Sequence, residues 1–295
     1  ALVETKKSAG KKTFTGTVLT NINLNDRGSN KQTHHIEIAA EEVVYEPGDA
    51  LGLVPYNAAA TVKSIIELLG VEAHKSVTYK GDAISLESLL QQKLNITCLP
   101  ERVVAKYATL VGQEIPATKI SLLDLLKIYP LKNSTQVDSL VALLEPITPR
   151  LYSISSSLEA VSDEVHITVA KDTFRINEEV KHGLCSDYLC NFPVDATFDF
   201  YIHKNGQFRL AEDEKDVIMI GPGTGIAPFR SFLQQRAATG AAGRNWLFFG
   251  DQHFVTDFLY QTELQDWLQT GVLTKLDVAF SRDSKEKVYL QHKMK

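Results

Sequence analysis

The sequence predicts a β domain split by a helical insertion, followed by an α/β domain with a parallel sheet. Three observations support this organisation. Alternating apolar and polar residues, typical of antiparallel strands, occur near the start of the chain and again in its middle. Helical apolar spacing fills the stretch between them. The last part alternates strand, helix, strand, helix and strand, which is typical of a parallel sheet with helices on its faces.

Length and composition limit the class of protein. The chain has 295 residues, which suggests about two domains, and 44% of them are hydrophobic, which excludes extended disorder. The net charge of −5 argues against a nucleic-acid partner, because phosphate backbones require concentrated positive charge. No apolar run is long enough to span a bilayer, and the lysine-rich residues 1–12 have no apolar core. We therefore expect neither a membrane segment nor a secretory signal.

The three cysteines indicate a reducing compartment, the cytoplasm. An odd and sparse set does not form a disulfide framework. Cys185 and Cys190 have no second pair with which to complete a zinc site, so we expect them to be buried as small apolar side chains. His34, His35 and Glu37 form the one compact ligand-like cluster in the sequence. With no further ligand nearby, exposed strand residues explain them better than a metal hydrolase does, and we expect no bound metal.

The expected β domain, a barrel in its simplest form, covers residues 13–56 and 146–212 and follows a linker at 1–12. Its strands are expected at 13–21, 34–39 and 50–54, and after the insertion at 150–155, 164–170, 197–203 and 207–210. The last two flank Asn205-Gly206, a strong hairpin signal.

The expected insertion covers residues 57–145. Asn57 can cap a helix that ends at Leu69, with Gly70 as its stop, and Val62, Ile65, Leu68 and Leu69 fall on one face. Further helical patterns occupy 86–94, 101–110, 121–128 and 137–144.

The expected α/β domain covers residues 213–295. Its strands are expected at 216–220, 245–250 and 273–280, the first of them fully buried, and its helices at 228–238 and 256–269. The acidic run at 212–216 before the first strand is expected to be a solvated loop.

A glycine-rich loop follows the first of these strands: Gly221-Pro222-Gly223-Thr224-Gly225-Ile226-Ala227-Pro228-Phe229. Glycines allow the backbone to approach an anion closely, and N–H groups at a helix start bind it. The spacing differs from the standard dinucleotide fingerprint, but a strand before and a helix after favour phosphate binding over a purely structural turn.

The third strand is followed by Ser281-Arg282-Asp283 and then by Lys287, Tyr289 and Gln291. Ligands of such sheets bind beyond the carboxyl ends of the strands, and an arginine there suits the 2′-phosphate of NADP. The alternative is a solvated charged loop; together with the glycine loop, the phosphate role is favoured.

Two motifs lie in the β domain. Arg150-Leu151-Tyr152-Ser153 combines a cation suited to a pyrophosphate with a ring suited to stacking on a heterocycle, although an amphipathic edge strand gives the same pattern. Gly183-Leu184-Cys185-Ser186 precedes a helical stretch, where Ser186 can donate to an anion or simply cap the helix.

Together these four motifs, in this order, resemble the diflavin branch of the ferredoxin–NADP reductase family, over nearly the whole chain from about Phe14. Within that branch, the stretch 245–283 is most similar to the sulfite-reducing members. The resemblance implies an antiparallel FAD-binding β-barrel, an inserted helical connecting domain and an NADP-binding α/β domain. It implies that Arg150 contacts FAD phosphate, Tyr152 stacks on the isoalloxazine, and Ser153 lies at the reactive flavin edge as the catalytic positioner.

The resemblance also assigns further nucleotide contacts. For FAD it implies Leu151, the strand Thr168-Val169-Ala170, the turn Gly183-Leu184-Cys185-Ser186 and, more weakly, Thr97 and Phe174. For NADP it implies Gly221, Gly223, Thr224, Gly225, Ser281, Arg282, Lys287, Val288, Tyr289, Leu290 and Gln291.

The function implied is that of an NADPH-dependent flavoprotein oxidoreductase. FAD accepts hydride from NADPH and passes electrons to an FMN domain of the same polypeptide, which feeds a haem and iron–sulfur subunit that reduces sulfite. The full-length protein is expected to be an oligomer. The family's FMN domain, Cys-Gly-Asp motif and C-terminal aromatic residue are not in this sequence. Two alternatives stay open: a reductase for a haem mono-oxygenase, and a module that holds FAD and a partner without turnover.

Overall fold

The computed structural model describes residues 12–176 and 179–294, so the expected linker lies, apart from Lys12, outside the described residues. The chain divides into two compact units, each described here by itself. The sheet unit comprises residues 12–53, 151–172 and 189–294, and the helical unit comprises residues 54–150 and 173–188.

The sheet unit contains a six-stranded sheet with the strand order β6-β3-β10-β1-β2-β7. The pairs β1–β10, β1–β2, β2–β7 and β3–β10 are antiparallel. Gly16 lies where β1 crosses the core, and a Cβ there would approach Ile38 Cγ2 to 2.4 Å, so only glycine fits. The strands are β1 (Thr13–Asn23), β2 (Thr33–Ala39), β3 (Ala50–Leu53), β6 (Arg150–Ser153), β7 (Glu164–Ala170) and β10 (Thr197–His203), with the short helix α6 (Leu158–Val161) before β7.

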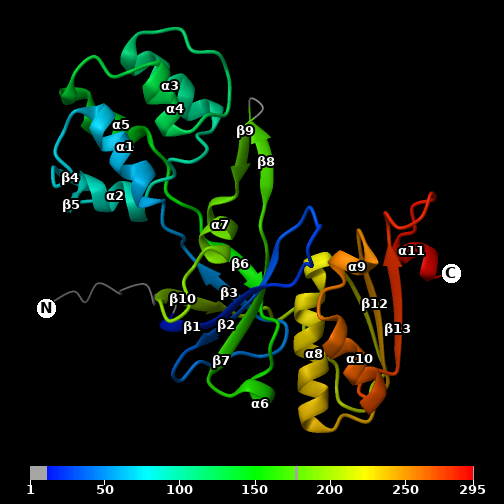
Figure 1. Ribbon diagram of the computed structural model, residues 1–295. Coiled ribbons are helices and arrows are strands. Elements are labelled where there is room, and N and C mark those ends of the chain that lie inside the picture. The colour runs from blue at the N-terminus through cyan, green and yellow to red at the C-terminus, as the bar shows by residue number, and fades with distance from the viewer. Residues whose placement is uncertain (1–11, 177–178, 295) are drawn as a thin grey trace, which may run out of the picture. The chain divides into compact units, whose positions relative to one another are not determined.

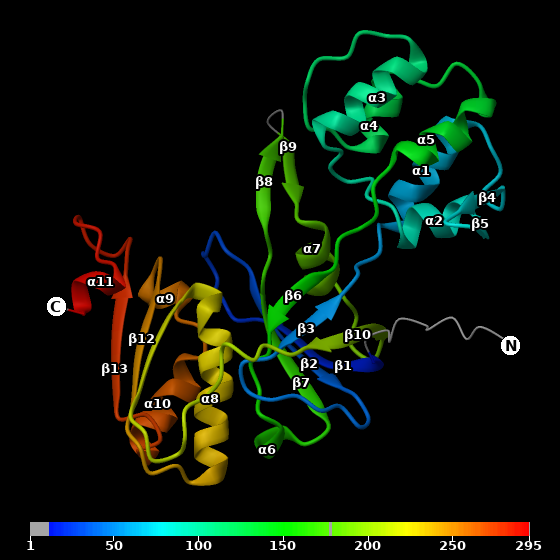
Figure 2. The same ribbon diagram turned by 180° about the vertical axis from the view of Figure 1, so that it is seen from behind.

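A second sheet in the same unit has three strands in the order β11-β12-β13, and each strand runs parallel to its neighbour. Helices α8 and α10 lie on one of its faces (Figures 1 and 2) and bury Met219, Leu247 and Phe249. On the other face, α11 packs against Phe248 and Ala279 through Leu290. The elements are β11 (Val217–Pro222), the 3₁₀ turn η2 (Gly223–Gly225), α8 (Ile226–Thr239), β12 (Asn245–Asp251), α9 (Phe254–Asp257), α10 (Gln261–Thr270), β13 (Lys275–Phe280) and α11 (Leu290–Lys293).

Two predictions for this sheet were wrong. Strand β11 is not fully buried, because Ile218 is 61% exposed on the face that α11 leaves open. The single helix expected at 256–269 is two helices, since the chain turns through Tyr260, which has the left-handed φ of 56°.

The helical unit has a core of its own, formed by apolar side chains of its helices around Leu89, Leu125 and Tyr107. Its helices and turns are α1 (Ala59–Leu69), α2 (Leu86–Gln92), α3 (Glu101–Val111), α4 (Leu122–Ile128), η1 (Ser134–Gln136) and α5 (Val137–Leu143). Two hairpins accompany them, β4 (Ser76–Tyr79) with β5 (Asp82–Ser85) and β8 (Thr173–Ile176) with β9 (Glu179–His182), and α7 (Leu184–Cys190) runs from this unit into the other.

Two predictions for helix α1 were also wrong. Asn57 does not cap α1: its side chain is buried and donates to the carbonyls of Leu90 and Leu94 instead. On α1, Leu68 is exposed and Ile66 is buried.

The expected strand at 207–210 is a loop rather than half of a hairpin. This segment is bound by Asp49 instead. The Asp49 carboxylate accepts from the Asn205 N–H at 2.9 Å and lies 2.7 Å from Arg209 Nη1. Of the described residues, none belongs to a helix long and apolar enough to cross a membrane.

Candidate nucleotide sites

A pocket of about 290 Å³ opens at the carboxyl ends of β11, β12 and β13. This is the edge where parallel sheets bind their ligands. Five predicted nucleotide contacts line it: Gly223, Ser281, Val288, Tyr289 and Leu290. Lys31, Pro222, Gly250, Asp251, Gln252 and Ala279 complete the lining.

The glycine loop is built for close backbone approach. A Cβ on Gly221 would lie 2.6 Å from the Gly225 carbonyl oxygen, so the turn requires glycine there. Gly223 has a left-handed φ of 54° and lines the pocket. The loop leads into the 14-residue helix α8, whose N-terminus carries partial positive charge. A phosphate therefore fits both the shape and the charge of this end of the pocket.

Lys31 lies at the same end of the pocket, in the segment between β1 and β2. Its Nζ is 2.5 Å from Asp251 Oδ1, and the Asp251 side chain is almost fully buried. A Cβ on Gly223 would lie 4.0 Å from the Lys31 ammonium, so this cation faces the glycine loop.

Asp283 fixes the loop after β13 in place. Its carboxylate accepts from the Phe254 N–H at 2.7 Å and lies 2.9 Å from His253 Nδ1. The hydrogen bond from Phe254, followed by that from His253, lowers the pKa of Asp283. The Arg282 N–H donates to the Gln252 carbonyl, and the Arg282 side chain is exposed. Six predicted NADP contacts do not line this pocket: Gly221, Thr224, Gly225, Arg282, Lys287 and Gln291.

The predicted flavin residues of the sheet unit lie on two strands. On β6, the side chains of Leu151 and Ser153 are exposed and therefore open to a ligand, and Tyr152 is half-buried. On β7, Val169 is fully buried and the Thr168 hydroxyl lies 2.6 Å from the Tyr260 hydroxyl, which leaves the backbone and the exposed Ala170 for contact.

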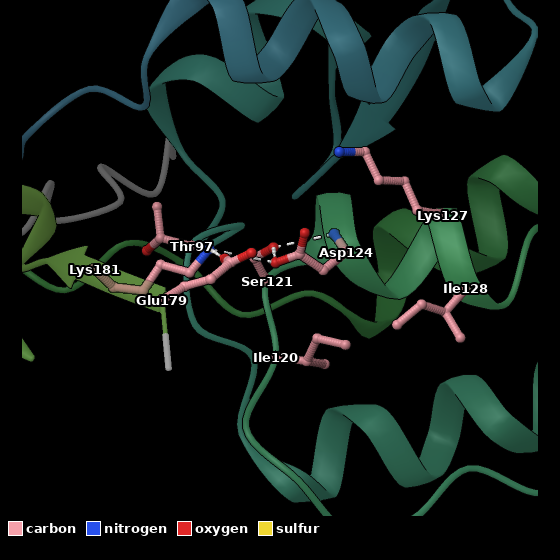
Figure 3. A pocket seen from close by; sticks show the side chains of 8 residues that line it. All are labelled: Thr97, Ile120, Ser121, Asp124, Lys127, Ile128, Glu179 and Lys181. Carbon is pink, nitrogen blue, oxygen red and sulfur yellow. Dashed lines mark hydrogen bonds and ion pairs between the residues drawn. The ribbon is translucent and has the colours of Figure 1, made fainter. Parts of the chain in front are cut away.

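In the helical unit, Arg150 and Phe174 are exposed on β6 and β8. Thr97 lines a pocket of about 220 Å³ with Ser121, Asp124, Lys127, Glu179, Lys181, Ile120 and Ile128 (Figure 3). One of its lysines is paired with two of its carboxylates, since Lys181 Nζ lies 2.7 Å from Glu179 Oε2 and 3.6 Å from Asp124 Oδ2.

The turn at Gly183 differs in detail from the prediction. Helix α7 begins at Leu184, so Ser186 lies inside its first turn, and its hydroxyl donates to the Gly183 carbonyl at 3.1 Å. The side chains of Cys185 and Cys190 are buried, as predicted.

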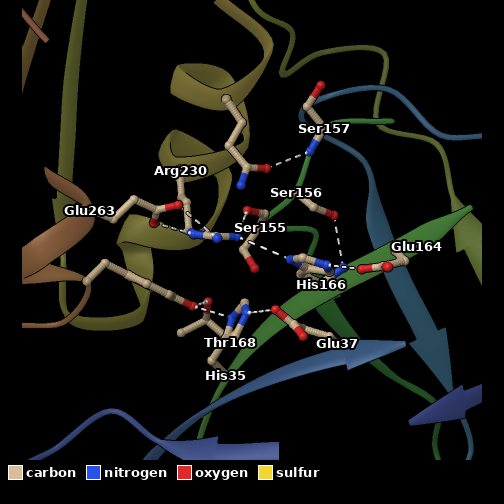
Figure 4. A network of polar contacts seen from close by, with 12 residues as sticks. His35, Glu37, Ser155, Ser156, Ser157, Glu164, His166, Thr168, Arg230 and Glu263 are labelled. Atoms are coloured by element: carbon tan, nitrogen blue, oxygen red, sulfur yellow. Dashed lines mark hydrogen bonds and ion pairs between the residues drawn. The ribbon is translucent and has the colours of Figure 1, made fainter. Parts of the chain in front are cut away.

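The expectation that His35 is exposed was wrong. His35 is 5% exposed and lies with Glu37 and His166, whose ligand atoms are all within 4.8 Å of one another (Figure 4). The pKa of His35 is lowered to about 4, chiefly by burial and next by the positive charge of Arg230. Burial also lowers the pKa of His166.

Hydrogen bonding accounts for this cluster without a cation. His35 Nε2 lies 3.2 Å from Glu37, and its Nδ1 lies 3.0 Å from the Tyr260 hydroxyl. His166 Nε2 lies 2.8 Å from Glu164, and its Nδ1 lies 3.5 Å from Arg230. Because a carboxylate only accepts, both neutral imidazoles carry the proton on Nε2 and accept at Nδ1. All four ring nitrogens are then engaged, which makes the cluster a polar network rather than a ligand set.

Sequence reasoning missed Lys31, Asp251, Arg230 and His166. A charged residue inside the apolar stripe of α8 was the available signal for Arg230. Lys31 and His166 reach their partners only through long-range contacts, which leave no local pattern.

Comparison with known proteins agrees with this geometry. Residues 6–123 and 117–188 match the family model for an FAD binding domain, and residues 219–295 match that for an oxidoreductase NAD-binding domain. The sulfite reductase [NADPH] flavoprotein alpha-component of Bacillus subtilis is 44% identical over 95% of this chain and 50% of its own length. Its counterparts in Klebsiella pneumoniae and Escherichia coli O157:H7 are 40% and 42% identical over 96% and 93% of the chain, and over 50% and 48% of their own lengths.

The chain spans about half the length of the curated relatives it matches. The matched FAD-binding region extends over more than half of the chain, and an NAD-binding region follows it. The chain therefore belongs to the FAD-binding domain family and combines its flavin-binding module with an oxidoreductase NAD-binding domain.

Proposed function

We propose that this chain is the FAD- and NADP-binding portion of an NADPH-dependent sulfite reductase flavoprotein. The observation that carries the proposal is the pocket at the carboxyl ends of β11–β13, lined by Gly223, Ser281 and Tyr289, in a chain whose other matched region is an FAD binding domain. FAD, when bound, supplies a two-electron acceptor that can release electrons one at a time.

The chain's own residues bind and orient in this proposal. The glycine loop and the N-terminus of α8 receive the NADPH pyrophosphate, with Lys31 as a nearby cation. Ser281, Arg282, Lys287 and Tyr289 bind the adenosine 2′-phosphate end, and Gly221, Thr224, Gly225, Val288, Leu290 and Gln291 shape the surrounding turns. Hydride transfer requires alignment of the donor and the acceptor rather than acid–base chemistry. Ser153 therefore acts by holding the reactive edge of the flavin in line with the nicotinamide.

FAD is assigned to the remaining predicted contacts. Arg150 binds its phosphate, Tyr152 stacks on the isoalloxazine, and Leu151 flanks it. Support comes from the exposure of Arg150, Leu151 and Ser153 on an edge strand of the sheet. The other assigned contacts are Thr97, Thr168, Val169, Ala170, Phe174, Gly183, Leu184, Cys185 and Ser186. The barrel, with domain limits at 13–56 and 146–212, 57–145 and 213–295, is part of this proposal.

The partners are proposed from the family resemblance, and the relatives' name, that of an alpha-component, is consistent with a further subunit. They are an FMN domain in the same polypeptide and a separate haemoprotein that reduces sulfite to sulfide. Assembly into an oligomer and residence in the cytoplasm stay predictions, the latter drawn from the free cysteines.

Steady-state turnover with ferricyanide as acceptor tests this proposal on the chain loaded with FAD. We expect NADPH oxidation that depends on added FAD and falls in Ser153→Ala without loss of bound flavin. Ser162→Ala, a serine substitution away from the proposed sites, is the matched control. Retention of FAD without any NADPH oxidation would contradict the proposal and favour a module that only holds the flavin.

A further inference from the structure

Helix α8 is bound to three serines after β6, Ser155 to Ser157, by a set of hydrogen bonds that we call the α8 anchor. Arg230 Nη1 donates to the Ser155 carbonyl at 2.8 Å, and the Ser231 hydroxyl donates to the Ser156 carbonyl at 2.6 Å. One turn further along the helix, the amide oxygens of Gln234 and Gln235 accept from the Ser157 N–H and hydroxyl at 3.1 and 2.5 Å.

The anchored segment is closed to solvent. Ser155, Ser156 and Ser157 are each 0% exposed, so their backbone groups depend on protein partners. Ser156 is also bound from the opposite side, since its hydroxyl lies 2.7 Å from the Tyr45 hydroxyl and accepts from the His166 N–H at 2.9 Å. The segment therefore cannot move away from α8 without leaving buried polar groups unpaired.

Besides Ser155 and His166, two further neighbours, Glu263 and Tyr260, hold the Arg230 side chain in one geometry. Figure 4 shows Glu263 beside it. The Arg230 Nε and Nη2 form a two-pronged ion pair with Glu263 at 2.6 and 2.9 Å, and the guanidinium lies 4.9 Å from the centroid of the Tyr260 ring. Tyr260 adopts a left-handed φ of 56°, a strained conformation that persists only where surrounding contacts determine it. A lysine has neither the fork nor the plane needed to reproduce these contacts.

The anchor joins the two segments on which the proposed function depends. Ser153 stands two residues before Ser155, and Gly225, the last glycine of the glycine loop, lies five residues before Arg230. We propose that Arg230 is a positioning residue for hydride transfer, which fixes the glycine loop on α8 relative to the strand that carries Ser153. This inference rests on the proposed function and adds a buried residue, 7% exposed, that is not among the proposed nucleotide contacts.

The test uses two variants of the anchor and one matched control. Arg230→Lys retains the charge but loses the fork, and Ser231→Ala removes only the hydroxyl that donates to Ser156. Arg244→Lys is the control, because Arg244 forms a similar two-pronged ion pair with Asp216 in the same sheet unit but is exposed and outside the anchor.

The first measurement is hydrogen exchange of the backbone amides in the chain without nucleotides. We expect faster exchange at 154–157 and at 223–229 together in both anchor variants, and wild-type exchange there in Arg244→Lys. Unchanged exchange at 154–157 in both anchor variants would overturn the anchor itself, whatever the chain's activity.

The second measurement is the single-turnover reduction of bound FAD by NADPH, with NADP⁺ affinity measured in parallel. We expect reduction about tenfold to a hundredfold slower in Arg230→Lys with unchanged NADP⁺ affinity, because a misplacement of about 1 Å can cost that much. Wild-type reduction rates in a variant with loosened exchange would overturn the positioning role. A wild-type chain that is not reduced would instead overturn the proposed function, and the positioning role with it, while the exchange data still decide whether the anchor exists.

Discussion

Arg282 is the residue whose proposed role is easiest to isolate, because its side chain is exposed while its loop is fixed by Asp283. Arg282→Ala should weaken NADPH binding by about tenfold to a hundredfold, the value of about 1.5–3 kcal/mol for a hydrogen bond to a charged group. NADH binding should not change, since NADH has no 2′-phosphate. Lys285→Ala removes the same charge from the same loop and is the control. Equal losses for both coenzymes would contradict the assignment.

His35 should make the stability of the protein depend on pH. Its pKa is about 4 in the folded chain and 6.5 when unfolded, so acid favours the unfolded state, which binds the proton. The stabilisation is complete above the unfolded pKa and is lost as the pH falls from 6.5 towards 4. Between about pH 7.5 and about pH 5 the loss from this imidazole is about 2 kcal/mol.

Urea unfolding at these two pH values measures the effect. His166, whose pKa is also lowered, contributes in the same direction. His35→Gln should have a smaller difference in unfolding free energy between the two pH values than the wild type. His74→Gln, a substitution of a histidine in the other unit, is the control and should retain the wild-type difference. An identical difference in His35→Gln would show that His35 is not buried in its neutral form.

At the scale of elements, the turn between β11 and α8 depends on Gly221. Gly221→Ala would place a Cβ 2.6 Å from the Gly225 carbonyl oxygen, which forces the backbone to shift. We expect a loss of about 1–3 kcal/mol in unfolding free energy, as for overpacked sites, and a loss of NADP⁺ binding. Gly206→Ala, where a Cβ meets nothing within 4 Å, should be nearly neutral in both assays. Retained nucleotide binding in Gly221→Ala would contradict the role of this turn.

The longer elements could be predicted from sequence because their signals are local. The alternation at β1, β2 and β7 and the helical spacing at α3 and α4 repeat over several residues. The short hairpins β4–β5 and β8–β9 were missed, since four-residue strands give little periodicity. The hairpin expected at Asn205-Gly206 failed because a distant carboxylate, Asp49, binds its backbone and Arg209.

The candidate sites also contain both residues that local sequence patterns predict and residues that only distant contacts bring together. Gly223, Ser281 and Tyr289 could be predicted together, since each belongs to a motif within about ten residues of the end of a parallel strand. The Lys31–Asp251 pair and the His35–Glu37–His166 network join residues far apart in sequence, so only the folded chain reveals them.

For the molecule as a whole, the proposed function requires one electron path that begins at NADPH and passes to FAD within this chain. The two family matches place both nucleotide-binding modules in one polypeptide. The FMN domain and the haemoprotein of the proposed assembly would act only after this step, so the step can be tested on the chain alone.

Anaerobic mixing of the FAD-loaded chain with one equivalent of NADPH tests this electron path. We expect loss of the visible flavin absorbance in a single turnover, with NADH much slower. A chain that stays colourless when supplied with FAD, or that binds FAD and keeps it oxidised in the presence of NADPH, would contradict it.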